Sequence, residues 1–112
     1  MQPAALAAEG GIMRSPVGAL VSPGEIAIDP ITLEYEQFGS DNEKPNSKDN
    51  IPTFFEPGTI VRSHAKHMIM PNGKTSAENS KMVLDSNAPE EMKRVMIKKI
   101  GNWESVHRTK PQ

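Results

Sequence analysis

The chain has 112 residues, with 13 basic and 14 acidic side chains, a formal net charge of −1 and no cysteine. This length allows at most one ordinary domain with a modest core, because Leu, Ile, Val and Phe together make up only about a fifth of the residues. The balanced charge gives no global attraction to nucleic acid or anionic membrane, and the lack of cysteine excludes disulfides, thiol nucleophiles and Cys-based zinc sites.

The first 18 residues predict an extended N-terminal arm. Its opening run of alanines and glycines lacks the basic region and the long apolar region of a secretory signal. No apolar run in the chain approaches the ~20 residues of a membrane-spanning helix. We therefore expect no membrane span and synthesis in a cytoplasm.

An internal repeat organises the region 19–74. Residues 19–28 (ALVSPGEIAI) match residues 53–62 (TFFEPGTIVR), with the two Pro-Gly pairs 34 positions apart (23 and 57). Pro presets φ and Gly accepts a positive φ, so the dipeptides Pro23-Gly24 and Pro57-Gly58 predict type II turns that lead into β-branched strands. We expect the two copies to pair as halves of a small sheet, with Gly24 and Gly58 both at positive φ and comparably costly to replace.

Two further loops are expected around the second copy. The segment 39–50 predicts a long polar loop, because its side chains cannot offset their ordering entropy by burial. After the second copy, Pro71-Asn-Gly73 predicts a turn that ends an extended segment at 67–70. The middle of the chain, which is acidic overall, lies between the two predicted β segments.

The last segment, 75–112, predicts two helices. Thr75 and Glu78 have capping-box spacing and begin a short helix that ends near Ser86. A second helix is expected near 89–108, where apolar residues recur at helical spacing. The predicted docking face of this helix consists of Met92, Val95, Met96, Ile100 and Trp103. We expect Trp103 to be buried against the β segments or against a neighbouring subunit, because a small core has few places for an indole.

Candidate catalytic and metal-binding residues do not form a recognised pattern. His64 and His67 form H-x-x-H, but no Cys or H-E-x-x-H accompanies them, so we interpret them as two surface imidazoles on an extended segment. Ser22, Ser63 and Ser76 lack a G-x-S-x-G frame, and the glycines form no phosphate-binding loop. We therefore expect no catalytic residue, no metal site and no cofactor; bound zinc would instead favour a metal-dependent enzyme.

The repeat resembles a segment of large virion proteins of tailed bacteriophages, especially tape-measure and other tail-internal or ejected proteins. There the pattern runs Gly-Gly, a spacer, then Ile-Pro-Ala-Met-Leu-Ser-Pro-Gly-Glu, an aromatic and Val-Ile. Here Gly10-Gly11 precede ALVSPGEIAI, and the second copy keeps the Ile-Pro lead in DNIPTFFEPGTIVR but departs at Glu56 and Thr59. These departures put in doubt any role specific to the Ser or the Glu of the motif. The resemblance covers about a third of the chain. The sequence as a whole is also similar in character to virion proteins of crAss-like gut phages.

The sequence thus predicts an α+β fold with an arm at 1–18, a repeat-containing β region at 19–74 and a helical region at 75–112. The resemblance implies a non-enzymatic structural component of a virion, in the tail, the neck or the packaged cargo. Low apolar content indicates that other virion proteins, in multiple copies, supply the surface that orders the chain. The alternative is a regulatory or DNA-contacting module that uses the basic C-terminal helix; no small-molecule substrate is expected.

Overall fold

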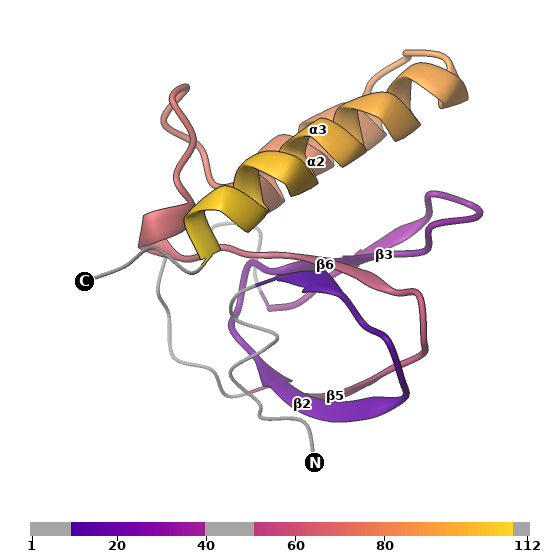
Figure 1. The fold of residues 1–112 in the computed structure, drawn as a ribbon, viewed down its shortest axis with the longest axis vertical. Coiled ribbons are helices and arrows are strands. Elements are labelled where there is room, and N and C mark those ends of the chain that lie inside the picture. Colours follow the sequence, from indigo (N-terminus) through magenta and orange to yellow (C-terminus); the bar gives the residue numbers. More distant parts are fainter. Residues whose placement is uncertain (1–9, 40–50, 109–112) are drawn as a thin grey trace.

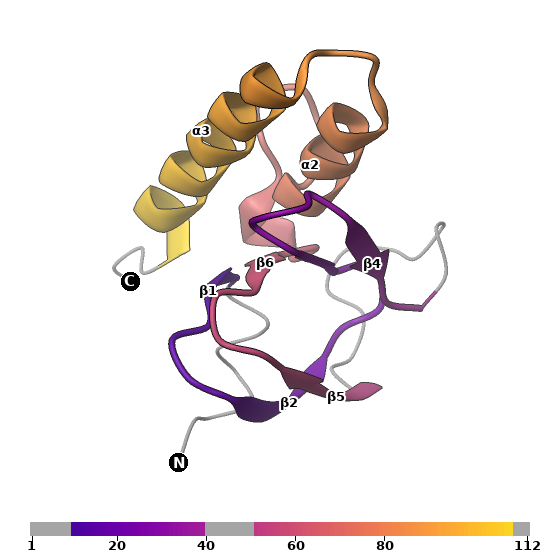
Figure 2. The same ribbon diagram turned by 90° about the vertical axis from the view of Figure 1, so that its right-hand side faces the viewer.

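The computed structural model describes residues 10–39 and 51–108, which form an α+β fold of three layers (Figures 1 and 2). Two helices cover one face of a four-stranded antiparallel sheet, and a two-stranded sheet lies on its other face. The α+β prediction is confirmed. The elements are β1 (Gly11–Ile12), β2 (Val17–Val21), β3 (Ile26–Ile28), β4 (Tyr35–Gln37), β5 (Ile51–Phe55), β6 (Ile60–Arg62), the one-turn 3₁₀ helix η1 (Lys66–Met68), α2 (Ser76–Asp85) and α3 (Glu90–Arg108).

Some of the expected segments lie wholly or partly outside this description. Residues 1–9 of the predicted arm and residues 40–50 of the predicted loop are not among the described residues. The described remainder of the arm includes β1 and the first two residues of β2.

Both Pro-Gly pairs form the predicted tight turns. The Glu25 N–H donates to the Ser22 carbonyl at 3.2 Å, and the Thr59 N–H donates to the Glu56 carbonyl at the same distance. The central glycines of these turns, Gly24 and Gly58, have φ of 96° and 90°. The prediction of positive φ at both is confirmed, and each turn joins a strand of the smaller sheet to a strand of the larger one.

The two copies of the repeat pair symmetrically. In the β2–β5 ladder Ala19 lies opposite Thr53, and in the β3–β6 ladder Ala27 lies opposite Val61. Both pairs join positions 34 apart in the chain, which are equivalent positions of the two copies. Antiparallel strands that meet at equivalent positions are related by a local two-fold axis through those positions. The expected pairing of the copies as halves of a small sheet is therefore confirmed, with an approximate two-fold symmetry.

This symmetry extends to a third strand in each half. The first half consists of β1, β2 and β3, and the second half consists of β4, β5 and β6. β1 pairs with β6, the last strand of the second half, and β4 pairs with β3, the last strand of the first half. Equivalent backbone hydrogen bonds follow the two outer strands. After β1, the Met13 N–H donates to the Thr59 carbonyl (2.9 Å) and the Met13 carbonyl accepts from the Gly58 N–H (2.7 Å). After β4, the Phe38 N–H donates to the Glu25 carbonyl (3.0 Å) and the Phe38 carbonyl accepts from the Gly24 N–H (2.6 Å). Every ladder between these six strands therefore joins one half to the other.

Two apolar clusters hold the layers together. The first lies between the two sheets and consists of Met13, Val21, Phe38, Phe55 and Val61. The second lies between the larger sheet and the helices and includes Ile26, Ile28, Ala77, Leu84, Ile97 and Ile100. Because side chains alternate along a strand, the middle residues of β3 and β6 face the first cluster while their neighbours face the helices. This division leaves Arg62, the last residue of β6, facing α3.

Both helices form where the sequence predicts them. The Thr75 hydroxyl accepts from the Glu78 N–H at 3.2 Å, and the Glu78 carboxylate accepts from the Thr75 N–H at 2.8 Å, which is the expected capping box at the start of α2. α3 spans Glu90–Arg108, in agreement with the predicted helix near 89–108. Two acidic residues in its first turn stabilise the positive end of the helix dipole.

The expected extended segment at 67–70 is wrong in part. η1 occupies Lys66–Met68, and extended pairing is limited to one bridge between Ile69 and Thr75 across the predicted turn. This turn of 3₁₀ helix places the Met68 side chain, which has no exposed surface, inside the protein. Burial of a large apolar side chain outweighs the local preference for an extended backbone.

Candidate functional site

The predicted docking face of α3 is divided between the core and the surface. Ile100 is buried in the cluster under the helices. Met92, Val95 and Met96 are 53%, 52% and 40% exposed, and Trp103 is partly buried. Most of this apolar stripe therefore lies on the outside of the protein and is not covered by another described element.

A different face of α3 packs on the sheet. Its buried residues are Ile97, Ile100 and Glu104, which follow each other at intervals of three and four. Of these residues the sequence analysis predicted Ile100 but missed Ile97 and Glu104, and a search for apolar residues passes over a carboxylate. The position of Glu104 is explained by Arg62, which emerges from the end of β6 directly below the helix.

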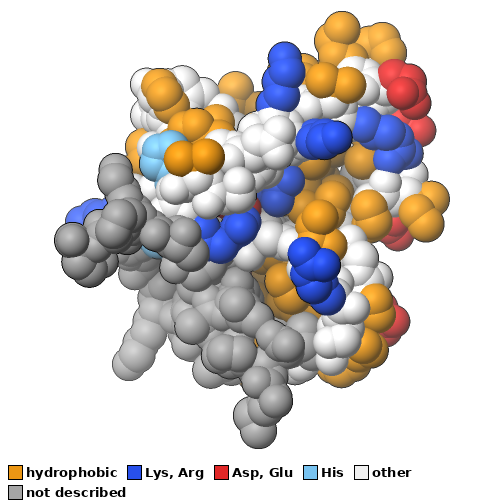
Figure 3. Space-filling view, viewed as in Figure 1, with side chains coloured by type: hydrophobic (Ala, Val, Ile, Leu, Met, Phe, Trp, Pro, Cys, Tyr) orange, Lys and Arg blue, Asp and Glu red, His pale blue; other side chains and the backbone are white. Residues whose placement is uncertain are grey.

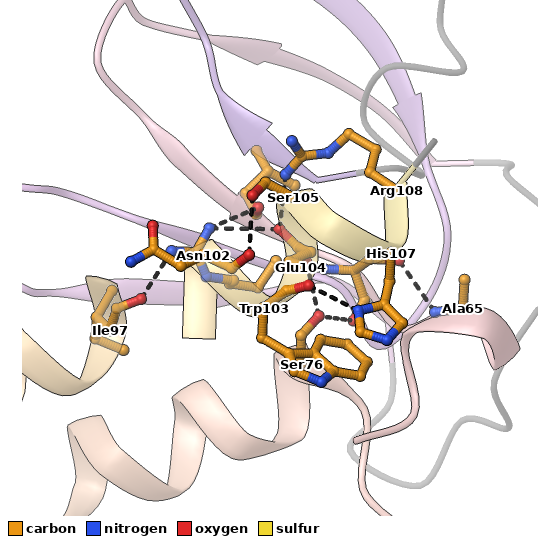
Figure 4. Close-up of polar contacts among 12 residues, drawn as sticks. Ala65, Ser76, Ile97, Asn102, Trp103, Glu104, Ser105, His107 and Arg108 are labelled. Carbon is orange, nitrogen blue, oxygen red and sulfur yellow. Dashed lines mark hydrogen bonds and ion pairs between the residues drawn. The ribbon is translucent and has the colours of Figure 1, made fainter. Parts of the chain in front are cut away.

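Glu104 is the centre of a buried polar network (Figure 4). Its Oε2 accepts from the Ser63 N–H at 2.9 Å and from the Ser76 hydroxyl at 2.6 Å. Its Oε1 lies 3.5 Å from a guanidinium nitrogen of Arg62 and 3.2 Å from one of Arg108. The Glu104 side chain has no exposed surface, so these four groups take the place of its water shell.

Arg62 is also buried, with 5% of its side chain exposed. One of its terminal nitrogens donates to the Ile97 carbonyl of α3 at 3.0 Å. Burial lowers the pKa of Arg62, the nearby Glu104 carboxylate raises it, and Arg108 lowers it further. Because the pKa of an arginine starts so high, the guanidinium stays charged, and Glu104 neutralises at most one of its two arginine neighbours.

Two glycines make room for this network. A Cβ on Gly101 would lie 2.5 Å from Nη2 of Arg62, and a Cβ on Gly10 would lie 2.4 Å from Oε1 of Glu104. Gly10 also has a φ of 76°, which side-chain-bearing residues rarely adopt. Gly101 lowers the helix propensity of α3, and the structure shows what this allows: the close approach of Arg62.

A groove of 710 Å³ runs between α3 and the segment around β1. Arg62, a member of the network, and Gly101 are among the residues that line it. Figure 3 shows Lys and Arg side chains gathered on this side of the protein with hydrophobic side chains between them. The charged residues that line the groove are Arg14, Arg62, Arg94, Lys98 and Arg108, and none of its described lining residues is acidic.

The three serines that were considered as nucleophiles are all buried. Ser22 donates to the carboxylate of Glu25 at 3.0 Å inside the first Pro-Gly turn. Ser63 and Ser76 both belong to the Glu104 network. Each of these serines contributes to the fold, and none lines the groove.

The two histidines of the H-x-x-H motif lie in different environments. His64 is buried, and its Nδ1 lies 2.9 Å from the Thr75 hydroxyl, whereas His67 is exposed. The interpretation as two surface imidazoles is therefore wrong for His64, which packs against Gly24. Residues 10–39 and 51–108 contain no group of three or more His, Cys, Asp or Glu that could hold a metal ion.

Trp103 stacks on His107 one helical turn later, with ring centroids 3.8 Å apart (Figure 4). Since Trp103 is only partly buried, Trp103→Ala is expected to cost less than the roughly 3–5 kcal/mol of a fully buried tryptophan. Chemical denaturation of the two proteins measures this difference. A loss within the full core range would show that the indole is packed more completely than its exposure indicates.

No described helix is long and apolar enough to span a membrane. Comparisons with protein-family models, with curated proteins and with solved structures find no significant match to this chain. The groove, the Glu104 network and the outer face of α3 are therefore interpreted from their own geometry and chemistry.

Proposed function

We propose that this chain is a non-enzymatic structural component of a tailed-phage virion, in the tail, the neck or the packaged cargo. The observation that carries this proposal is the exposed apolar face of α3, formed by Met92, Val95 and Met96. Three large apolar side chains on adjacent turns of one helix are typical of a surface that packs against another protein. Flexible methionines suit such a contact because they adapt to irregular surfaces.

The Ser-Pro-Gly-Glu segment supports a structural role. In the first copy the Ser22 hydroxyl bonds to the buried Glu25 carboxylate, so both motif residues stabilise the turn itself. The second copy keeps the backbone turn with Glu56 and Thr59 in their places. The segment that resembles phage virion proteins is thus a fold-building element, which is consistent with a repeated structural module.

A DNA-contacting module is the alternative, and the basic residues of α3 favour it only in part. The Lys93 amine donates to the Leu84 carbonyl at 2.9 Å, and Arg94 donates to backbone carbonyls of the 30–31 turn and to Glu90. Lys98 and Lys99 are exposed. A steep fall of DNA affinity with salt concentration would favour this alternative.

The double variant Met92→Ser/Met96→Ser tests the virion proposal. Both side chains are exposed, so we expect the isolated protein to keep its helical circular dichroism and its melting temperature within about 2 °C, since exposed substitutions change stability little. Incorporation into particles, measured by quantitative mass spectrometry of purified virions, is expected to fall at least about tenfold.

Ile31→Ser is the matched control, because Ile31 is 78% exposed and its backbone contacts Arg94, which does not belong to this face of α3. It is expected to leave incorporation unchanged. Normal incorporation of the methionine variant would refute the role of this face. Absence of the unmodified chain from purified particles would refute the virion proposal itself.

A further inference from the structure

We propose that the groove between α3 and β1 binds an extended acidic peptide segment of a partner protein, one that also carries apolar side chains. This inference goes beyond the proposed virion role. It uses a different face of α3 from the exposed methionines and holds for any partner of this chemistry.

The shape of the groove fits an extended chain. The residues of α3 that line it run from Arg94 to Arg108, a helical length of about 21 Å at ~1.5 Å per residue. At ~3.3 Å per residue, an extended peptide of about six residues spans this length. β1 forms the opposite wall and is an outer strand of its sheet, so its backbone is positioned to pair with an added strand.

The charge of the groove selects an anion. Arg14, Arg62, Arg94, Lys98 and Arg108 line the groove, and no carboxylate is among the described lining residues. No ion pair to Arg14 or Lys98 is found within residues 10–39 and 51–108. Arg62 and Arg108 already pair with Glu104, and Arg94 pairs with Glu90, so the exposed Arg14 and Lys98 are the cations on which an anion would bind.

Arg62, one of the lining residues, has a buried donor without a partner. The Nε–H of Arg62 is inaccessible to solvent and has no hydrogen-bond acceptor among the described residues, while the terminal nitrogens of the same side chain are bonded. Buried polar groups without a partner are rare in folded proteins and call for an explanation. Because this nitrogen has no accessible surface, a ligand oxygen reaches it only if the Arg62 side chain shifts when the groove is occupied.

The apolar part of the groove favours a peptide over a nucleic acid. Ile12, Leu33, Ile60 and Ile97 line it, and Ile12 is 62% exposed. Apolar side chains of a peptide would cover this surface, whereas a phosphate backbone would leave it in contact with water. The described lining residues include no Trp, Tyr or Phe on which unpaired bases could stack.

Fluorescence anisotropy tests the proposal with a labelled eight-residue peptide that alternates Glu and Leu. We expect the full chain to bind this peptide at least about tenfold more tightly than the same peptide with Gln for Glu, or with Ser for Leu. Labelled single-stranded and duplex DNA are titrated in parallel at the same salt concentration.

Two charge-reversal variants locate the binding. Lys98→Glu changes a lining residue, whereas Lys99→Glu changes the next residue, which is also exposed but does not line the groove. We expect Lys98→Glu to weaken peptide binding at least about tenfold and Lys99→Glu to change it less than about twofold. Ile12→Ser, at an exposed position, is expected to weaken binding of the Glu-Leu peptide while leaving the melting temperature unchanged.

Three results would overturn the proposal. The first is no peptide binding at millimolar concentration. The second is equal weakening by Lys98→Glu and Lys99→Glu, which would indicate a general charge effect. The third is DNA binding that is stronger than peptide binding and is lost with Lys98→Glu, which would assign the groove to nucleic acid. None of these results bears on incorporation into particles, so the virion proposal is tested separately.

Discussion

Replacing Glu104 with Ala is expected to lower the free energy of unfolding by about 3–5 kcal/mol, the range for removing one partner of a buried ion pair. The change leaves the guanidinium of Arg62 buried opposite no carboxylate and removes the acceptor of the Ser63 N–H. It also opens a cavity at a position with no exposed surface. Urea denaturation followed by circular dichroism measures the loss.

Glu90→Ala is the matched control for this prediction. Glu90 pairs with Arg94 at the same spacing of four residues and the same 3.2 Å as Glu104 with Arg108, but Glu90 is 61% exposed. An exposed pair of this kind contributes about 0–1 kcal/mol. Equal losses for the two variants would show that the Glu104 network does not stabilise the fold. The double change Arg62→Met/Glu104→Leu is expected to recover much of the loss, because it removes both buried charges.

Gly24→Ala is expected to destabilise the protein by about 2–6 kcal/mol, from two effects of about 1–3 kcal/mol each. The first is the positive φ of 96°, which alanine adopts only with strain. The second is steric, because the new Cβ would lie 2.3 Å from Cδ2 of His64. Thermal denaturation of the variant and the unmodified chain measures the sum.

Gly58→Ala separates these two effects. Gly58 has a similar φ of 90°, but a Cβ there would meet only Pro30, at 3.9 Å. We expect this variant to show the backbone cost alone, which corrects the sequence-based expectation that the two glycines are equally costly to replace. Adding His64→Ala to Gly24→Ala should relieve the steric part. A double variant with no such recovery would argue against close packing of His64 on Gly24.

Local signals in the sequence predicted most of the fold. The Pro-Gly turns and the capping box of Thr75 and Glu78 depend on residues within four positions of each other, so their conformations follow from sequence alone. The self-similarity of the repeat predicted which segments pair. The two-fold arrangement was not predicted, because it depends on the registers of the β2–β5 and β3–β6 ladders, and no local sequence pattern determines either register.

The candidate site was harder to predict because its members are far apart in the chain. Arg62 and Glu104 meet only in the folded protein, and each reads locally as a surface charge. One signal was present: Arg62 stands where the first copy of the repeat has Ile28, so the repeat changes from an apolar residue to a charged one at an otherwise matched position. A charged residue at a core position of one copy indicates a buried partner elsewhere.

The interlocked halves of the sheet have a consequence for how the chain folds. The β3–β4 ladder is a local hairpin, with Ile28 opposite Tyr35, whereas the other three ladders join residues at least 30 positions apart. Loop closure between distant segments costs entropy before any contact offsets it, which slows folding relative to local structure. The hairpin of α2 and α3 is local by comparison and has its own cap. We infer that the helices and the β3–β4 hairpin form before the three long-range ladders close.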